Sequence, residues 1–180
     1  SMLLMPRLAE RARAEAPGVR LRLLDSAFGD VERLLQDDVL DLALERPLKV
    51  SDWVSAETLF VSPFVVIAAY GDPVVDAATP GQPMPLDLFC RLPHALRSID
   101  GSMSGNVDQA LAAIGRVRKV SLAVPHFYGV ALAVARGGLI ACVPRQFADA
   151  VAGPLNLAVF EPPVPCPAPE IQMYWHSRHD

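Results

Sequence analysis

The sequence lacks the short motifs that mark the common enzyme classes and structural metal sites. It has no GxSxG turn, HExxH helix, P-loop or GxGxxG turn, and its cysteines show no CxxC spacing. Its four histidines do not have the ligand spacing of a zinc site. We therefore expect no metal and no cofactor, and binding is favoured over catalysis.

Positive charge and long apolar runs are also scarce. Sixteen Lys and Arg stand against twenty Asp and Glu, a net charge of -4, with no basic block of the kind that contacts nucleic-acid phosphates. The apolar runs fall short of the roughly 20 residues that span a bilayer, so we expect no membrane contact. Three widely spaced cysteines, Cys90, Cys142 and Cys166, cannot form a closed disulfide set and favour a reducing, cytoplasmic location.

Apolar residues are plentiful, at 52% of 180 residues, which suffices for one domain or two small lobes. Helical and strand periodicities alternate along the chain, which predicts parallel strands joined by crossover helices on both faces of a sheet. We expect helices over residues 4–16, 31–38, 86–91, 107–114, 126–135 and 145–152. We expect strands over residues 19–23, 41–44, 59–70, 94–97, 117–124, 139–143, 155–160 and 171–175.

Two apolar strands, 59–70 and 155–160, bracket the middle of the sequence. If both cross between lobes, residues 66–158 form an inserted second lobe, and residues 1–65 with 159–180 form the first. The cleft between such lobes is the natural ligand site.

The strongest polar cluster is the glycine-containing turn at residues 98–105, which precedes a predicted helix. Backbone N–H groups and hydroxyls at a helix start favour a carboxylate or phenolate. Asp100 would repel an anion but could accept a hydroxyl proton. The candidate ligand contacts are Ser98, Asp100, Gly101, Ser102, Met103 and Ser104. An ordinary helix cap by Ser104 would explain the same pattern.

A second cluster, His126, Phe127 and Tyr128, also lies where a predicted strand gives way to a helix. These rings could line an aromatic pocket, with the histidine or the phenol fixing the ligand. Equally, Phe127 could be core and Tyr128 could face solvent or a partner. Arg46, after the strand at 41–44, is a further candidate contact or a surface charge of little consequence.

Several runs together carry a family resemblance. They are residues 8–24 with Pro17-Gly18, Asp41-Leu42-Ala43-Leu44, Gly71-Asp72-Pro73, residues 106–111, 124–127 and 139–145, and Tyr174-Trp175-His176. In this order they resemble the effector-binding domain of LysR-type transcriptional regulators, in the branch that regulates nodulation and aromatic-compound degradation.

The resemblance implies a two-lobed α/β fold of the type 2 periplasmic-binding-protein kind. Each lobe would be a mostly parallel sheet flanked by helices, and two crossover strands would join the lobes. A small aromatic or phenolic effector in the interlobe cleft would control DNA binding and transcription, without chemistry. Effector contacts carry over to residues 98–104 and to His126 and Phe127. DNA would be reached only through an N-terminal winged helix-turn-helix absent from these residues, and the first lobe would lack the family's first strand and last helix.

The resemblance also implies a homodimer or tetramer, in which the opening helix of one subunit packs on the helix at residues 127–136 of another. The interface candidates are Leu4, Leu8, Ala12, Ala131 and Val134. Two other hypotheses stay open at this point. One is a transport-type solute-binding protein of the same fold, and the other is an enzyme that uses a cysteine or histidine.

Overall fold

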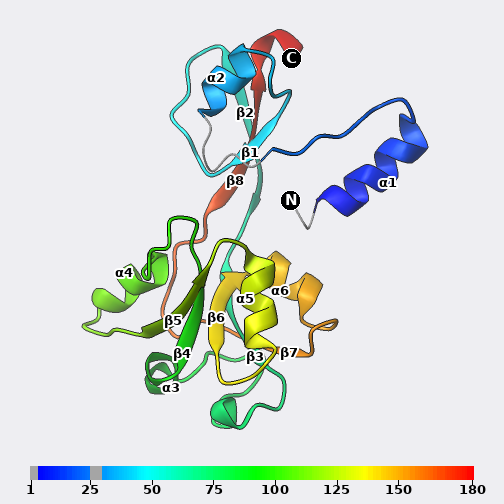
Figure 1. Ribbon diagram of the computed structural model, residues 1–180. Coiled ribbons are helices and arrows are strands. Elements are labelled where there is room, and N and C mark those ends of the chain that lie inside the picture. Colours follow the sequence, from blue (N-terminus) through cyan, green and yellow to red (C-terminus); the bar gives the residue numbers. More distant parts are fainter. Residues whose placement is uncertain (1–3, 25–29) are drawn as a thin grey trace. The chain divides into compact units, whose positions relative to one another are not determined.

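The computed structural model describes residues 4–24 and 30–180, and the chain divides into two compact units (Figure 1). One unit comprises residues 1–61 with 169–180, and the other comprises residues 62–168. The sequence-based boundary after residue 158 therefore differs from the observed one. Residues 159–168 lie in the second unit because the strand β7 (Leu157–Phe160) pairs along that unit's sheet and Val164 is buried in the same core.

The first unit is built on a three-stranded sheet. Its helices are α1 (Met5–Glu15) and α2 (Val31–Gln36), its strands are β1 (Ala43–Glu45), β2 (Val54–Val61) and β8 (Glu170–His176), and a short turn η3 (Ser177–His179) follows. The strand order is β1-β8-β2 and both pairings are antiparallel. The expected mostly parallel sheet is therefore wrong for this unit.

A small core lies beside this sheet. Its buried members are Val31, Leu35, Ala43, Val54 and Tyr174. The carboxylate of Asp30 caps α2 by accepting the N–H of Arg33 at 3.4 Å. The hydroxyl of the fully buried Tyr174 accepts the N–H of Leu48 at 2.8 Å and lies 2.6 Å from the Gln172 amide oxygen. The buried hydroxyl of Tyr174 is thus hydrogen-bonded, as burial requires.

The segment after α1 does not form its predicted strand. Val19, Leu21 and Leu23 alternate with arginines, but residues 19–24 pair with no strand in the described part of the chain. A strand is stabilised by its ladder of backbone hydrogen bonds, so period-two alternation without a pairing partner does not make a strand. All three apolar side chains are exposed.

The second unit is larger and contains helices and strands in alternation. Its strands are β3 (Phe64–Ala69), β4 (Pro93–Arg97), β5 (Lys119–Val124), β6 (Ile140–Pro144) and β7. Its helices are α3 (Leu86–Arg91), α4 (Asn106–Ala112), α5 (Phe127–Val134) and α6 (Arg145–Val151), with a short η2 (Pro73–Val75). The predicted helices are confirmed to within two residues at either end.

The sheet of the second unit has the order β5-β4-β6-β3-β7 and is mixed. Strand β4 runs parallel to β5 and β6, whereas β3 runs antiparallel to β6 and β7. Parallel pairing is thus confined to β5, β4 and β6, which α4 and α5 connect along the chain. The expected α/β class is confirmed, and parallel strands are fewer than expected.

Helices cover both faces of this sheet. Val66, Ala68, Ile140 and Cys142 share one core with residues of α3 and α4. Successive strand residues point to opposite faces, so their buried neighbours Val65, Ile67, Ala141 and Val143 face the other side. Helices α5 and α6 contact β3 and β6 there, and Figure 1 shows α5 lying along the sheet.

The predicted strand at residues 59–70 is two strands. Ser62 and Pro63 separate β2 from β3, and the division between the units falls here. Proline has no N–H to give to a ladder, which explains the interruption. The Ser62 hydroxyl instead donates to the Gln146 amide oxygen at 3.1 Å.

Two predicted dimer contacts are corrected by the structure. Ala131 and Val134 on α5 are fully buried in their own unit, whereas Tyr128 and Leu132 on the same helix are exposed. Because α5 is apolar on all sides, its sequence does not reveal which face meets the sheet. No residue of α1 is buried by the rest of the described chain, and Leu4 and Leu8 are exposed.

No helix among residues 4–24 and 30–180 combines the length and the apolar character needed to cross a membrane.

Candidate functional site

The two predicted ligand clusters meet at one edge of the second unit's sheet. The turn at residues 98–105 follows β4, and the start of α5 follows β5, its parallel neighbour. The Ser98 N–H donates to the Val124 carbonyl at 2.9 Å, and Arg97 Nε donates to the Pro125 carbonyl at 3.2 Å. Carboxyl ends of parallel strands are the usual place for ligands in such sheets.

Asp100 organises the first half of the turn. Its Oδ1 accepts the Ser102 N–H at 3.0 Å and the Ser98 hydroxyl at 2.9 Å. These two donors hold the pKa of Asp100 below its ordinary value. Gly101 has a φ of 77°, in the left-handed region where glycine is unstrained. The turn therefore presents a negative charge at neutral pH.

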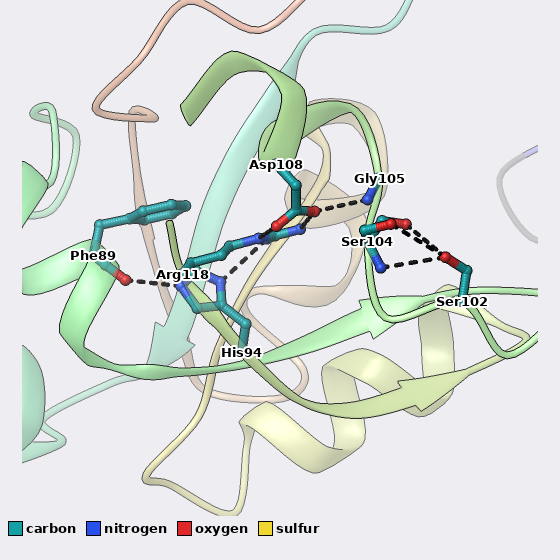
Figure 2. A network of polar contacts seen from close by, with 7 residues as sticks. All are labelled: Phe89, His94, Ser102, Ser104, Gly105, Asp108 and Arg118. Atoms are coloured by element: carbon teal, nitrogen blue, oxygen red, sulfur yellow. Dashed lines mark hydrogen bonds and ion pairs between the residues drawn. The ribbon is translucent and has the colours of Figure 1, made fainter. Parts of the chain in front are cut away.

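The second half of the turn is tied together by hydroxyls. The Ser102 hydroxyl donates to the Ser104 carbonyl at 3.2 Å and accepts the Ser104 N–H at 3.3 Å (Figure 2). Met103 between them is exposed. The residue that caps α4 is Gly105 and not Ser104, so the simple capping explanation of the serine is wrong. The Ser102 hydroxyl is thus held by the Ser104 backbone, and the two hydroxyl oxygens lie 3.4 Å apart.

The aromatic cluster is partly buried and partly exposed, and its role as a ligand pocket stays a prediction. His126 is the N-cap residue of α5 and is exposed, as is Tyr128. The Phe127 ring is half-buried, with its centroid 5.6 Å from that of Phe147. The Phe127 ring also contacts Arg97, whose guanidinium carbon lies over the ring, 5.7 Å from the centroid, in a cation–π arrangement.

Arg97 is a residue that the sequence analysis missed. It is exposed and carries a fixed positive charge at the same edge as Asp100. Its position as the last residue of a strand, just before the polar turn, is the signal that could have identified it.

A chain of polar contacts supports the turn from inside the unit (Figure 2). Arg118 makes a two-pronged ion pair with Asp108, from Nε to Oδ1 at 2.9 Å and from Nη2 to Oδ2 at 2.8 Å. Asp108 Oδ2 also accepts the Gly105 N–H at 2.7 Å. On the other side, Arg118 Nη1 lies 3.3 Å from His94 Nδ1, and His94 Nε2 lies 2.8 Å from the Phe89 carbonyl.

The hydrogen-bond partners of His94 determine which of its ring nitrogens carries the proton. A carbonyl can only accept and a guanidinium can only donate, so His94 carries its proton on Nε2 and accepts at Nδ1. The residue is fully buried, and burial lowers the pKa of His94 to about 4, with the charge of Arg118 acting in the same direction. The ring is therefore neutral, and every polar atom of this buried group has a partner.

The ion pair is largely removed from water. The Arg118 side chain is 1% exposed and that of Asp108 is 24% exposed. Burial opposes the ionisation of Asp108, but the Arg118 guanidinium and the Gly105 N–H outweigh it and hold the pKa of Asp108 below its ordinary value. The sequence gives no sign of this pair because Arg118 stands in an ordinary alternating strand pattern.

The remaining predicted residues lie in the first unit. Arg46 directly follows β1, and its carbonyl is 3.2 Å from the Tyr174 hydroxyl. Its role as a ligand contact, like the dimer role of Leu4, Leu8 and Ala12, stays a prediction.

The first unit also has a surface hollow of about 440 Å³ that contains no predicted site residue. It is lined by Asp41, Leu42, Met173, Trp175, His179 and Asp180. The Asp180 carboxylate already accepts the Trp175 indole N–H and the Ser55 hydroxyl, each at 2.7 Å. Because the Asp180 carboxylate is engaged within the unit, we assign no ligand to this hollow.

Among the described residues, no group of three or more His, Cys, Asp or Glu side chains is arranged to hold a metal ion. Cys142 is buried in the core, and burial raises the pKa of its thiol to about 12. A thiol in this environment is not a nucleophile at neutral pH.

Comparison with protein families identifies the chain's relatives. The profile of the LysR substrate binding domain matches residues 1–180. The HTH-type transcriptional activator NahR of Pseudomonas putida is 27% identical over 175 residues, which are 97% of this chain and 57% of NahR. The chain therefore spans somewhat more than half the length of that relative.

Solved structures agree with this match. The regulatory domain of MexT, a transcriptional activator in Pseudomonas aeruginosa, superposes with a TM-score of 0.78 at 32% identity, covering 98% of this chain and 83% of that one. The effector-binding domain of QuiR in complex with shikimate superposes with a TM-score of 0.69 at 16% identity, covering 98% and 82%. The second likeness shows the fold alone.

Proposed function

Because this chain belongs to the LysR substrate-binding domain family, we propose that it senses a small hydroxylated aromatic or phenolic molecule on behalf of a transcriptional regulator. One observation carries the proposal. The turn at residues 98–105 and the start of α5 meet at the ends of two adjacent parallel strands, joined by the hydrogen bond from Ser98 to Val124. That the effector lies between the lobes stays a sequence-based prediction.

The chemistry of this edge suits a ring that carries both a hydroxyl and an acidic group. The ionised Asp100 can accept a hydrogen bond from a phenol, whereas it repels a carboxylate placed beside it. Arg97 supplies the opposite charge and can pair with a carboxylate. Phe127, in contact with the Arg97 guanidinium, and the exposed Tyr128 add aromatic surface.

The regulatory role follows from binding and requires no chemical step by this domain. An effector changes the activity of a regulator only if it binds two conformational states with different affinity. We propose that binding here shifts such an equilibrium in a cytoplasmic homodimer or tetramer. DNA would be contacted by a winged helix-turn-helix outside these 180 residues.

A thermal-shift titration tests the proposal. The probes are benzoate, phenol and 4-hydroxybenzoate, with shikimate, the ligand of QuiR, as a non-aromatic comparison. A ligand at a hundred times its Kd stabilises the folded state by about 2.7 kcal/mol, so saturable shifts are expected for at least one aromatic probe.

The matched variants are Ser102→Trp, which fills the turn, and Thr79→Trp, which adds the same ring to an exposed residue elsewhere in the second unit. We expect Ser102→Trp to abolish the ligand-induced shift and Thr79→Trp to retain it. Absence of any saturable shift with the wild-type chain, or an equal shift in Ser102→Trp, would contradict the proposal.

A further inference from the structure

The contacts in Figure 2 end on the turn that the proposed function uses, and they begin deep in the unit. Asp108 Oδ2 is shared between Arg118 Nη2 and the Gly105 N–H, so one carboxylate oxygen joins the buried cation to the end of the turn. We propose that Arg118 is a positioning residue, which fixes the turn at residues 98–105 without touching the effector. This proposal rests on the proposed function.

Arg118 orients two other side chains through its hydrogen bonds, in addition to filling space in the core. Its three guanidinium nitrogens are all engaged, Nε and Nη2 by Asp108 and Nη1 by His94. The planar fork of an arginine can make these contacts together, and a lysine ammonium cannot. The orientation of the Asp108 carboxylate, and with it the Gly105 contact, therefore depends on Arg118.

The turn is held at both of its ends. At its start, the Ser98 N–H donates to the Val124 carbonyl in the neighbouring strand. At its finish, Gly105 donates to Asp108. Between these points Asp100, Ser102 and Ser104 bond to one another or to Ser98. Without the second anchor, Gly105 is held only through its carbonyl, which accepts the N–H groups of Asp108 and Gln109. The turn is then less firmly fixed, which lowers its affinity for a ligand that needs its polar groups pre-organised.

The same buried pair also stabilises the unit, so the experiment must separate local from global effects. Amide hydrogen exchange does this without any ligand, because each amide reports its own opening. We compare the wild-type chain with Arg118→Met, which keeps the length of the side chain and removes its donors. Arg116→Met is the matched control. Arg116 lies two residues before Arg118 in the sequence, and its substitution removes an exposed ion pair with Asp87.

We expect Arg118→Met to accelerate exchange of the Ser102 and Gly105 amides relative to the wild-type chain. This acceleration should exceed that of the central-strand amides of Val66 and Ala141 by about tenfold or more. Arg116→Met should leave the turn amides unchanged. Unchanged turn amides in Arg118→Met, or equal acceleration in the turn and in the central strands, would overturn the positioning role. If Arg118→Met does not fold, Arg118→Lys serves in its place and is judged by the same ratio.

A double variant tests whether Arg118 acts through Asp108. If it does, Arg118→Met combined with Asp108→Ala gives the same turn exchange as Asp108→Ala alone. Additive effects of the two substitutions would show that Arg118 does not act through this carboxylate.

Ligand titration then connects the anchor to binding. With whichever of benzoate, phenol or 4-hydroxybenzoate stabilises the wild-type chain, Arg118→Lys should weaken affinity by about tenfold. Equal affinity in the two proteins would contradict the positioning proposal while leaving the proposed function intact. If none of the probes binds the wild-type chain, the proposed function fails, and the exchange experiment still decides whether Arg118 fixes the turn.

Discussion

The guanidinium of Arg97 lies over the ring of Phe127, 5.7 Å from its centroid, while its Nε donates to the Pro125 carbonyl. This contact links the last residue of β4 to the first residue of α5 and places a cation at the edge where Asp100 supplies an anion. The site thus has charges of both signs, which distinguishes it from a simple anion site at a helix start.

Arg97 should discriminate between probes that carry a carboxylate and probes that do not. We expect Arg97→Gln to weaken benzoate binding by about tenfold, the equivalent of 1.4 kcal/mol, because a charge-assisted hydrogen bond is lost. Phenol binding should change by less than about twofold. Isothermal titration calorimetry measures both, with Arg136→Gln, an exposed arginine that follows α5, as the control. An equal loss for phenol and benzoate would assign Arg97 a role in folding the edge and not in selecting the ligand.

His94 should make the stability of the chain depend on pH. Its pKa is about 4 in the folded state against an ordinary 6.5, so the unfolded state binds a proton more readily. Its contribution is constant above pH 6.5 and is lost as the pH falls from 6.5 toward 4, by up to about 3 kcal/mol.

Urea unfolding at a series of pH values measures this loss, and His94→Gln is the comparison. A glutamine can donate to the Phe89 carbonyl and accept from Arg118, yet it does not titrate. The pH dependence between 6.5 and 4 should therefore be smaller in His94→Gln. The same slope in both proteins would mean that titrating groups other than His94 cause the loss.

The elements of the second unit could be predicted from the sequence because their periodicity agrees with their burial. The helices at α3 to α6 and the strands β4 to β7 all lie within two residues of their expected bounds. The prediction of a strand at residues 19–23 is wrong because alternation of apolar and polar residues does not show whether a neighbouring strand is present to pair with.

The buried contacts of Arg118 beneath the turn could not be predicted from the sequence. Val117 is 80% exposed while the side chain of its neighbour Arg118 is 1% exposed, the reverse of what hydrophobicity suggests. An arginine is buried only when its partners satisfy it, and those partners, Asp108 and His94, come from other elements. Sequence patterns identified the turn and the aromatic cluster, whereas the pairing of β4 with β5 brought them together.

Cys142 should be unreactive in the folded chain. Burial excludes reagents and raises the pKa of its thiol to about 12, so almost no thiolate forms at pH 8. We expect iodoacetamide to leave Cys142 unmodified in the native protein and to alkylate it after unfolding, as followed by mass spectrometry. Cys90, which is half-buried, is the internal comparison and should react first. Rapid labelling of native Cys142 would show that the core around β6 opens readily.

The most direct test of the proposed ligand site is a titration of the isotope-labelled chain with 4-hydroxybenzoate, followed by amide chemical shifts. We predict saturable shifts that are largest in residues 98–105 and 126–128, because these two segments form the proposed ligand-binding edge of the sheet. Saturable shifts confined to the first unit, around Trp175 and Met173, would contradict it, as would the absence of any saturable change.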